Sequence, residues 1–323
     1  MASGDLKESG GRFALLYHLS QTFNSSLDLD EVLDRVMDEV IEAIGAERGF
    51  VALRDEDGVL VFRSARGIEQ TTIDHPEFQT DVARSKFVER LTATINFANH
   101  IVVPSDDVKE KLEQRMVGTG HRVPVLVAPL GVDLGDPPEA VEKSDKPYFV
   151  VLGTIEPRKN HGFLLDIWER MHQKMDASKV PELRIIGARG WKNEALFDRL
   201  DNSPLMGKTV FELGPLPDKE MKQHLAGATG LLFPSLAEGF GLPPYEAASL
   251  GVPTITTPLP SIEAHLADMA VYAKAGDMYQ WFRAIRDLAS EDPAEQTRRR
   301  SELRAYRIPT WYRHFARVFD LIM

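Results

Sequence analysis

Hydrophobic residues in the first 80 positions follow first a helical and then a strand-like pattern. At 29–44 they recur every three or four residues through four turns, with Asp28 at the position of an N-cap. A shorter stripe of the same period occupies 13–23. Two apolar runs, 49–53 and 59–65, then flank an Asp-Gly turn, so this part of the chain predicts helices followed by a β-hairpin.

From residue 148 onward, short apolar runs alternate with helical stretches. Nearly continuous runs of this kind are typical of parallel strands that are buried on both faces of a sheet. They occupy Tyr148–Leu152, Leu183–Ile186, Val210–Leu213, Leu231–Phe233, Thr254–Thr256 and Ala270–Tyr272. The alternation predicts an α/β fold with a Rossmann-like, doubly wound parallel sheet, whose ligands bind in loops at the carboxyl ends of the strands.

Weaker patterns connect these two parts and follow the second one. We expect the connecting segment to fold as helix 87–97, strand 101–103, helix 107–115 and strand 123–127. The tail from residue 277 is helical in pattern and broken at Pro309. Its run Arg298–Arg300 is interpreted as a solvated helix face.

Composition restricts the classes of protein to which the chain can belong. Its 323 residues suffice for about two domains, and the absence of cysteine excludes disulfides, a cysteine nucleophile and thiolate metal sites. The first ten residues contain no signal-peptide core and no run reaches about 18 apolar residues, so we expect a cytoplasmic protein. The net charge of −11 disfavours nucleic acid and broad contact with anionic lipid, and leaves peripheral membrane contact open.

The negative charge is concentrated at the start of the chain. The first 80 residues contain 7 Lys and Arg against 16 Asp and Glu, whereas the remaining residues contain 31 against 33. A local cationic pocket for an anionic ligand is therefore compatible with the second part.

The loop after the first strand of the predicted sheet, 153–161, combines a glycine with two cations. Gly153 lets the backbone turn close to a ligand, and Arg158 and Lys159 supply positive charge for a diphosphate. Asn160 can cap the helix that follows. Taken alone, such a loop could equally be a charged turn.

A second loop, 234–246, carries the strongest chemical signal. Two glycines expose backbone N–H groups, and Pro243 suits the first turn of a new helix whose positive end faces the loop. Glu238 lies in the loop and Glu246 about one turn inside that helix. Two carboxylates can therefore reach hydroxyl groups on either side of a bound phosphate.

This loop lies in "FPSLAEGFGLPPYEAASLGVPTITT", with "VLGTIEPRKNH" upstream and "RIIGARGW" between, and the whole resembles the retaining glycosyltransferases of family 4, which have the GT-B fold. Residues 148–323 resemble the donor-binding domain of that family, and 81–135 the end of its N-terminal domain. The resemblance implies transfer of a hexosyl group from a nucleotide-diphosphate sugar to an unknown acceptor, with retention of configuration and without a metal or other cofactor. The form "GTIEPRKNH" favours GDP-mannose as the donor.

The resemblance also implies roles for single residues. Glu246 would hold the ribose hydroxyls of the donor. Glu238, Lys159 and Arg158 are the predicted catalytic residues: Glu238 binds the transferred sugar, Lys159 neutralises the diphosphate and Arg158 is the second cation. Many relatives have arginine at the position of Thr154. The other positions placed around the donor are Gly153, Thr154, Gly187, Arg189, Gly239, Phe240, Gly241 and Leu242. Simple turn or helix-start roles are the alternative for Gly187, Arg189 and the loop Pro260–Ile262.

Residues 11–80 resemble the first half of a GAF domain, a small-ligand and dimerisation module. "LDLDEVLDRVMDEVIEAIGAERGFVALRDEDG" and "FRSARGIEQ" carry this second resemblance. We therefore predict a fusion of a truncated GAF-like α+β segment at 1–80, a remnant of a GT-B N-terminal domain at 81–140 and a nucleotide-sugar-binding domain at 141–323. Natural recombination, an engineered chimera and a misjoined gene are alternative origins of such a fusion. The N-terminal helices could pair two copies into a homodimer.

No histidine lies in a motif that would assign it to catalysis. We expect His75, His100 and His121 to be surface or packing residues. The alternative to an enzyme is a non-catalytic nucleotide-sugar-binding or GAF-type signalling protein.

Overall fold

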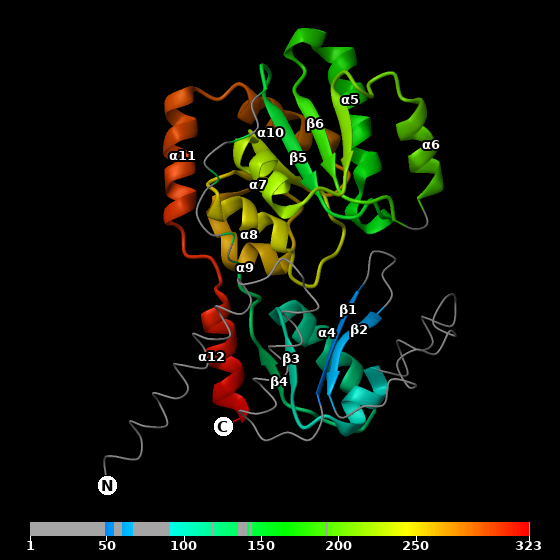
Figure 1. Cartoon of the computed structure of the whole chain (residues 1–323), viewed down its shortest axis with the longest axis vertical. Helices are drawn as coiled ribbons and strands as arrows, with labels where there is room; N and C mark the ends of the chain where they lie inside the picture. The colour runs from blue at the N-terminus through cyan, green and yellow to red at the C-terminus, as the bar shows by residue number, and fades with distance from the viewer. Residues whose placement is uncertain are drawn as a thin grey trace. The chain divides into compact units, whose positions relative to one another are not determined.

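The computed structural model divides into two compact units (Figure 1). The described residues are 49–54, 60–66, 91–117, 119–132, 134, 138, 141, 144–190 and 193–322. The larger unit consists of Ser105–Asp107 and Val132–Pro309, and the smaller unit of the remaining segments. The predicted N-terminal helices lie outside the described residues.

The larger unit is built on a six-stranded parallel sheet with the order β10-β9-β8-β5-β6-β7. Its strands are β5 (Tyr148–Leu152), β6 (Glu182–Ile186), β7 (Val210–Gly214), β8 (Gly230–Phe233), β9 (Thr254–Thr256) and β10 (Ala270–Tyr272). All six strands match the apolar runs of the sequence, so the predicted doubly wound sheet is confirmed. The chain runs outward from β5 through β6 to β7 and then returns to the other side of β5 with β8. The strand order thus reverses between β5 and β8, which is where open α/β sheets bind ligands.

Helices cover both faces of this sheet (Figure 1). The helical segments of this unit are η3 (Pro157–Lys159), α5 (His161–Lys174), η4 (Ala177–Lys179), α6 (Glu194–Asn202), α7 (Asp218–Gly227), α8 (Leu242–Ser249), α9 (Pro260–Leu266), η5 (Ala267–Met269), α10 (Met278–Ala289) and α11 (Pro293–Ala305). Alternate residues of β5 enter different cores: Phe149 joins the core under α5 and α10, whereas Val150 joins the core under α7 and α8. Burial on both faces explains why the strands are nearly continuous in apolar residues.

The arginine run in α11 corrects one interpretation made from the sequence. Arg298 is exposed and pairs with glutamates on its own helix, as a solvated helix face would. Arg300, in contrast, is largely buried and donates hydrogen bonds to the carbonyl oxygens of Ala226, at 3.1 Å, and Ala228. The interpretation is therefore wrong for Arg300, because α11 turns this residue towards the open carbonyl groups at the end of α7.

The described residues of the smaller unit include two short sheets. β1 (Gly49–Arg54) and β2 (Leu60–Arg66) form an antiparallel pair, which confirms the two predicted strands, whereas the predicted turn between them lies outside the described residues. β3 (Ile101–Val103) and β4 (Val125–Val127) pair in parallel, and residues 91–97 are helical. β4 begins two residues later than the sequence predicts.

Two longer helices also contribute described residues to this unit. α4 (Asp106–Val117) packs Leu112 and Met116 against Ile95 and Val103. α12 (Trp311–Ile322) follows the predicted break at Pro309, and the His314 side chain lies 3.1 Å from the carbonyl oxygen of Ala128. None of the helices in the described part of the chain combines the length and the apolar character needed to cross a membrane.

Candidate functional site

The candidate site lies at the carboxyl ends of β5 and β8, beside the reversal in strand order. Backbone contacts join the two loops that follow these strands. The N–H of Leu236 donates to the carbonyl oxygen of Arg158 at 2.9 Å, and the Asn160 side chain donates to Pro234 at 3.4 Å. Asn160 occupies the N-cap of α5 with φ 58°, and its side chain makes no capping bond. The predicted side-chain cap is therefore wrong, because the amide reaches across to the second loop instead.

Charged side chains from the two loops form a compact cluster. The Lys159 ammonium lies 2.8 Å from one carboxylate oxygen of Glu238, and the Arg158 guanidinium lies 2.5 Å from the other. Glu238 and Lys159 are nearly enclosed, with 9% and 12% of their side chains exposed, whereas 41% of Arg158 is exposed. The structure thus brings together the three residues that the sequence singles out as catalytic.

Glu156 is a further member of this cluster that the sequence analysis missed. It is buried, and its carboxylate pairs with the Arg158 guanidinium. The available signal was weak: a carboxylate two residues before an arginine, in a loop already identified as a ligand loop. Burial of a carboxylate is costly unless a partner compensates for it, which marks Glu156 as structurally tied to Arg158.

The second carboxylate of the motif, Glu246, lies in α8, which begins at Leu242 with proline in its first turn as predicted. Gly241 occupies the N-cap at φ 87°, where a Cβ would also lie 2.9 Å from the side chain of Ile262. Burial and the negative charge of Asp218 raise the pKa of Glu246 from 4.5 to about 7, although Lys159 acts in the opposite direction. Glu246 therefore titrates near neutral pH.

The residues between the two glutamates are fixed by packing. The Gly239 carbonyl oxygen accepts a 2.7 Å hydrogen bond from the Ser105 hydroxyl. The Phe240 ring is buried and stacks on Tyr245, with ring centroids 4.7 Å apart. Tyr245 in turn donates to the carbonyl oxygen of Ser261, at the start of α9. These contacts anchor the loop to Ser105 and to the start of α9.

Two predicted glycines allow the loops after β5 and β6 to lie against each other. Gly187 has φ 153°, and a Cβ on it would lie only 2.2 Å from the carbonyl oxygen of Gly153. The neighbouring backbone forms a β-bridge between Ile155 and Arg189. A Cβ on Gly190 would lie 2.6 Å from the Thr154 side chain, so Thr154 occupies the space between the loops.

The guanidinium of Arg189 is held by two carboxylates. It makes two 2.7 Å bonds to Glu212 and also bonds Asp201, at 3.0 and 2.5 Å. Hydrogen bonding to Glu212 and to Asp201 raises the pKa of Arg189, so it stays charged. This side chain links β7 and α6 to the loop after β6, and its predicted contact with the donor stays a prediction.

The histidines occupy different environments. His100 and His121 are exposed, in agreement with their predicted surface role, and His75 lies outside the described residues. His161, the first residue of α5, is buried. Burial, assisted by the charge of Lys159, lowers the pKa of His161 to about 3. Its imidazole is therefore neutral at physiological pH.

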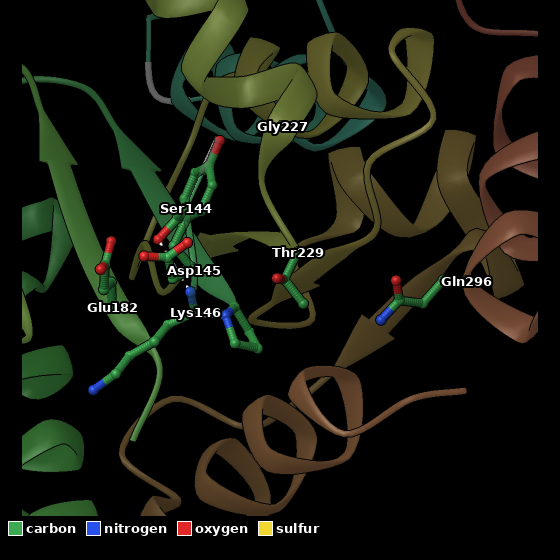
Figure 2. A pocket seen from close by; sticks show the side chains of 9 residues that line it. Ser144, Asp145, Lys146, Glu182, Gly227, Thr229 and Gln296 are labelled. Atoms are coloured by element: carbon green, nitrogen blue, oxygen red, sulfur yellow. Dashed lines mark hydrogen bonds between the residues drawn. The ribbon is translucent and has the colours of Figure 1, made fainter. Parts of the chain in front are cut away.

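A hollow of about 860 Å³ lies at the opposite, amino edge of the sheet (Figure 2). Its lining consists of Ser144, Asp145, Lys146, Pro147, Tyr148, Glu182, Gly227, Thr229 and Gln296. Glu182 pairs there with Arg184 at 2.8 Å. Because this edge is remote from the carboxyl ends of the strands, the hollow is separate from the candidate site.

Within the described ranges, no group of three or more His, Asp or Glu side chains is arranged to hold a metal ion. The expectation of a reaction without a metal stays a prediction.

The sequence is similar to those of two mannosyltransferases of Escherichia coli. The chain is 28% identical over 237 residues to the serotype-specific mannosyltransferase WbdA of Escherichia coli, covering 68% of this chain and 27% of WbdA. It is 32% identical over 131 residues to the O-antigen chain mannosyltransferase B of Escherichia coli, covering 41% and 34%. The chain thus spans about a third or less of the length of these relatives.

The fold is similar to that of solved glycosyltransferases. A crystal structure of Staphylococcus aureus TarM with UDP matches with a TM-score of 0.59 at 15% identity, covering 73% of this chain and 46% of TarM. Together with the parallel sheet, this shows an α/β, GT-B-like fold.

The family model for glycosyl transferases group 1 matches residues 136–306, which include the sheet, both site loops and both glutamates. With more than half of its residues inside this match, the chain belongs to the glycosyl transferases group 1 family.

Proposed function

We propose that this chain transfers a hexosyl group from a nucleotide-diphosphate sugar to an acceptor, with retention of the anomeric configuration. The observation that carries the proposal is the pairing of Glu238 with Lys159 at the reversal in strand order, with Glu246 in the helix that follows the same loop. This arrangement combines a cation for a diphosphate with two carboxylates for hydroxyl groups on either side of it. The names of the related mannosyltransferases support mannose as the transferred sugar, and GDP-mannose is the proposed donor.

Each part of the donor has a proposed partner. The ribose hydroxyls donate hydrogen bonds to Glu246, and hydroxyls of the transferred sugar donate to Glu238. Lys159 binds the diphosphate, aided by the N-terminus of α8 and the backbone N–H groups of 239–242.

The reaction requires stabilisation of a leaving group. The bond between the anomeric carbon and the distal phosphate breaks, and the acceptor oxygen forms a new bond to the same face of that carbon. The proton of the acceptor hydroxyl passes to the departing phosphate. Lys159 and the N-terminus of α8 stabilise the negative charge that develops on this phosphate.

A thermal-shift experiment with GDP and UDP tests the donor site. We expect one of the two to raise the melting temperature, and Glu246→Ala to abolish the rise because the ribose loses its acceptor. Glu302→Ala, which changes an exposed carboxylate on α11, is the matched control and should leave the rise intact. If neither nucleotide stabilises the unmodified chain, the proposed site is wrong.

Turnover then separates the enzyme from a binding module. Release of GDP from GDP-mannose, or of UDP from UDP-glucose, is measured with a panel of monosaccharide and disaccharide glycosides as acceptors. Nucleotide binding without turnover would favour a non-catalytic nucleotide-sugar-binding protein. In that case the alternative is a GAF-type signalling protein whose N-terminal segment pairs two copies into a homodimer. Measurement of the protein's size in solution tests this pairing.

A further inference from the structure

Four side chains of the site form one continuous series of alternating charges. Glu156 pairs with Arg158, Arg158 pairs with Glu238, and Glu238 pairs with Lys159. All four belong to the larger unit. The series joins the loop after β5 to the loop after β8. Lys159 and Glu238, which meet in it, are 79 positions apart in the chain.

The two cations of this series are held in different ways. The Arg158 guanidinium has carboxylates on two sides and also donates a 3.0 Å bond to the carbonyl oxygen of Ala237. Burial works against its charge, yet Glu238 and then Glu156 raise the pKa of Arg158. Three of its five N–H donors are thus engaged by acceptors within the protein, and these contacts fix the orientation of the guanidinium.

Lys159, in contrast, pairs with a single carboxylate, although its side chain is nearly enclosed. Its ammonium carries three N–H donors, of which Glu238 accepts one at 2.8 Å. A Cβ on Gly153 would lie 3.4 Å from the terminal carbon of the lysine side chain, so the glycine leaves space beside the ammonium. The ammonium also lies 5.0 Å from the centre of the Phe233 ring, so a turn towards a diphosphate exchanges one ion pair and this weaker ring contact for the phosphate.

We propose that Arg158 is a positioning residue for Glu238 and not a ligand of the donor diphosphate. Glu156 fixes the guanidinium, and the guanidinium fixes one oxygen of Glu238. When Lys159 turns to the diphosphate, the other oxygen of Glu238 is released to accept a hydrogen bond from the sugar. This inference rests on the proposed function, and it replaces the second-cation role that the sequence suggested for Arg158.

The proposal separates recognition of the sugar from recognition of the nucleotide. If Arg158 only orients Glu238, its replacement weakens binding of the nucleotide sugar. Binding of the nucleoside diphosphate, which lacks the sugar, stays unchanged. If Arg158 binds the diphosphate directly, both ligands lose affinity by the same factor. The ratio of the two affinities therefore measures the role of Arg158, and a general loss of structure would not change that ratio selectively.

The test measures dissociation constants by calorimetry for GDP and GDP-mannose, and in parallel for UDP and UDP-glucose. In Glu156→Gln and in Arg158→Lys, we expect the nucleoside diphosphate to bind within about twofold of the unmodified chain. The nucleotide sugar should bind about tenfold more weakly, which is the order expected for a lost charge-assisted hydrogen bond. Arg158→Lys keeps the charge and serves if Glu156→Gln does not fold.

Glu182→Gln is the matched control. Glu182 pairs with Arg184 at the same two-residue spacing, but at the amino edge of the sheet. It should change neither affinity. If Glu156→Gln and Arg158→Lys lose affinity for both ligands by the same factor, or for neither ligand, the positioning role is overturned and the proposed function stays intact. If the unmodified chain binds neither GDP nor UDP, both the proposed function and this inference fail.

Discussion

Glu246 combines two properties that conflict in the unliganded protein. Its carboxyl lies in a largely buried position in α8, and burial together with Asp218 raises its pKa from 4.5 to about 7. The folded chain therefore disfavours the charged form that the ribose of a donor would need. We expect this conflict to reduce stability as the pH rises, and replacement of Glu246 by glutamine to remove the effect.

The magnitude follows from the proton affinities of the two states. Between pH 4.5 and about 7 the carboxyl is protonated in the folded chain and ionised in the unfolded chain, so unfolding releases a proton and the free energy of unfolding falls with rising pH. Since a tenfold change in proton affinity is worth about 1.4 kcal/mol, the total loss is on the order of 3 kcal/mol and is complete above neutral pH. Below pH 4.5 the carboxyl is protonated in both states and contributes nothing to the pH dependence.

Urea unfolding of the unmodified chain and of Glu246→Gln at pH 5, 6, 7 and 8 measures this loss. The difference in unfolding free energy between the two proteins should grow in favour of the variant with rising pH, because all other titrating groups are shared. Glu302→Gln, an exposed glutamate on α11, should follow the unmodified chain. A difference between the unmodified chain and Glu246→Gln that is constant with pH would refute the raised pKa.

Three further outcomes follow from the same structure. Gly187→Ala should lower the free energy of unfolding of the larger unit by about 2 kcal/mol or more in urea, because its Cβ would meet a backbone oxygen at 2.2 Å. Gly207→Ala, at φ 70° with open space, should lower it by only about 1 kcal/mol. Arg300→Met should lower the free energy of unfolding by about 2 kcal/mol in the same assay, since it leaves two buried carbonyl groups without a donor. Arg298→Met, at an exposed position, should change it by less than about 0.5 kcal/mol. If nucleotide binding ionises Glu246, calorimetry in buffers of different ionisation enthalpy at pH 6.5 should detect proton release, and Glu246→Gln should eliminate that contribution.

The fold of the larger unit could be predicted because its strands carry a local signal. Tyr148–Leu152 is buried along its whole length, and such a strand must be apolar at every position. The start of α8 was equally local, since proline in the first turn and glycine before it are properties of neighbouring residues. Both candidate loops were found because parallel strands place their carboxyl ends at one edge of the sheet.

Side-chain partners were predicted less well, because they depend on distances in space. Asn160 was expected to cap α5, yet its backbone adopts φ 58° and its amide reaches Pro234. Arg300 was expected in solvent, yet α11 packs it against the end of α7. Both errors arise where a neighbouring element offers an acceptor that the local sequence does not contain.

The sequence by itself determined the parallel sheet, the position of the two site loops and the presence of a cation and two carboxylates in them. Only the tertiary structure decided which charges form ion pairs. Arg158 pairs with Glu156 and Glu238, and Lys159 also pairs with Glu238. Arg189 pairs with Glu212 and Asp201. The physical reason is the range of each effect. Burial and backbone preference leave a periodic pattern in neighbouring residues. An ion pair acts over a few ångströms in space, and its partners can be far apart in the chain, as Lys159 and Glu238 are by 79 positions.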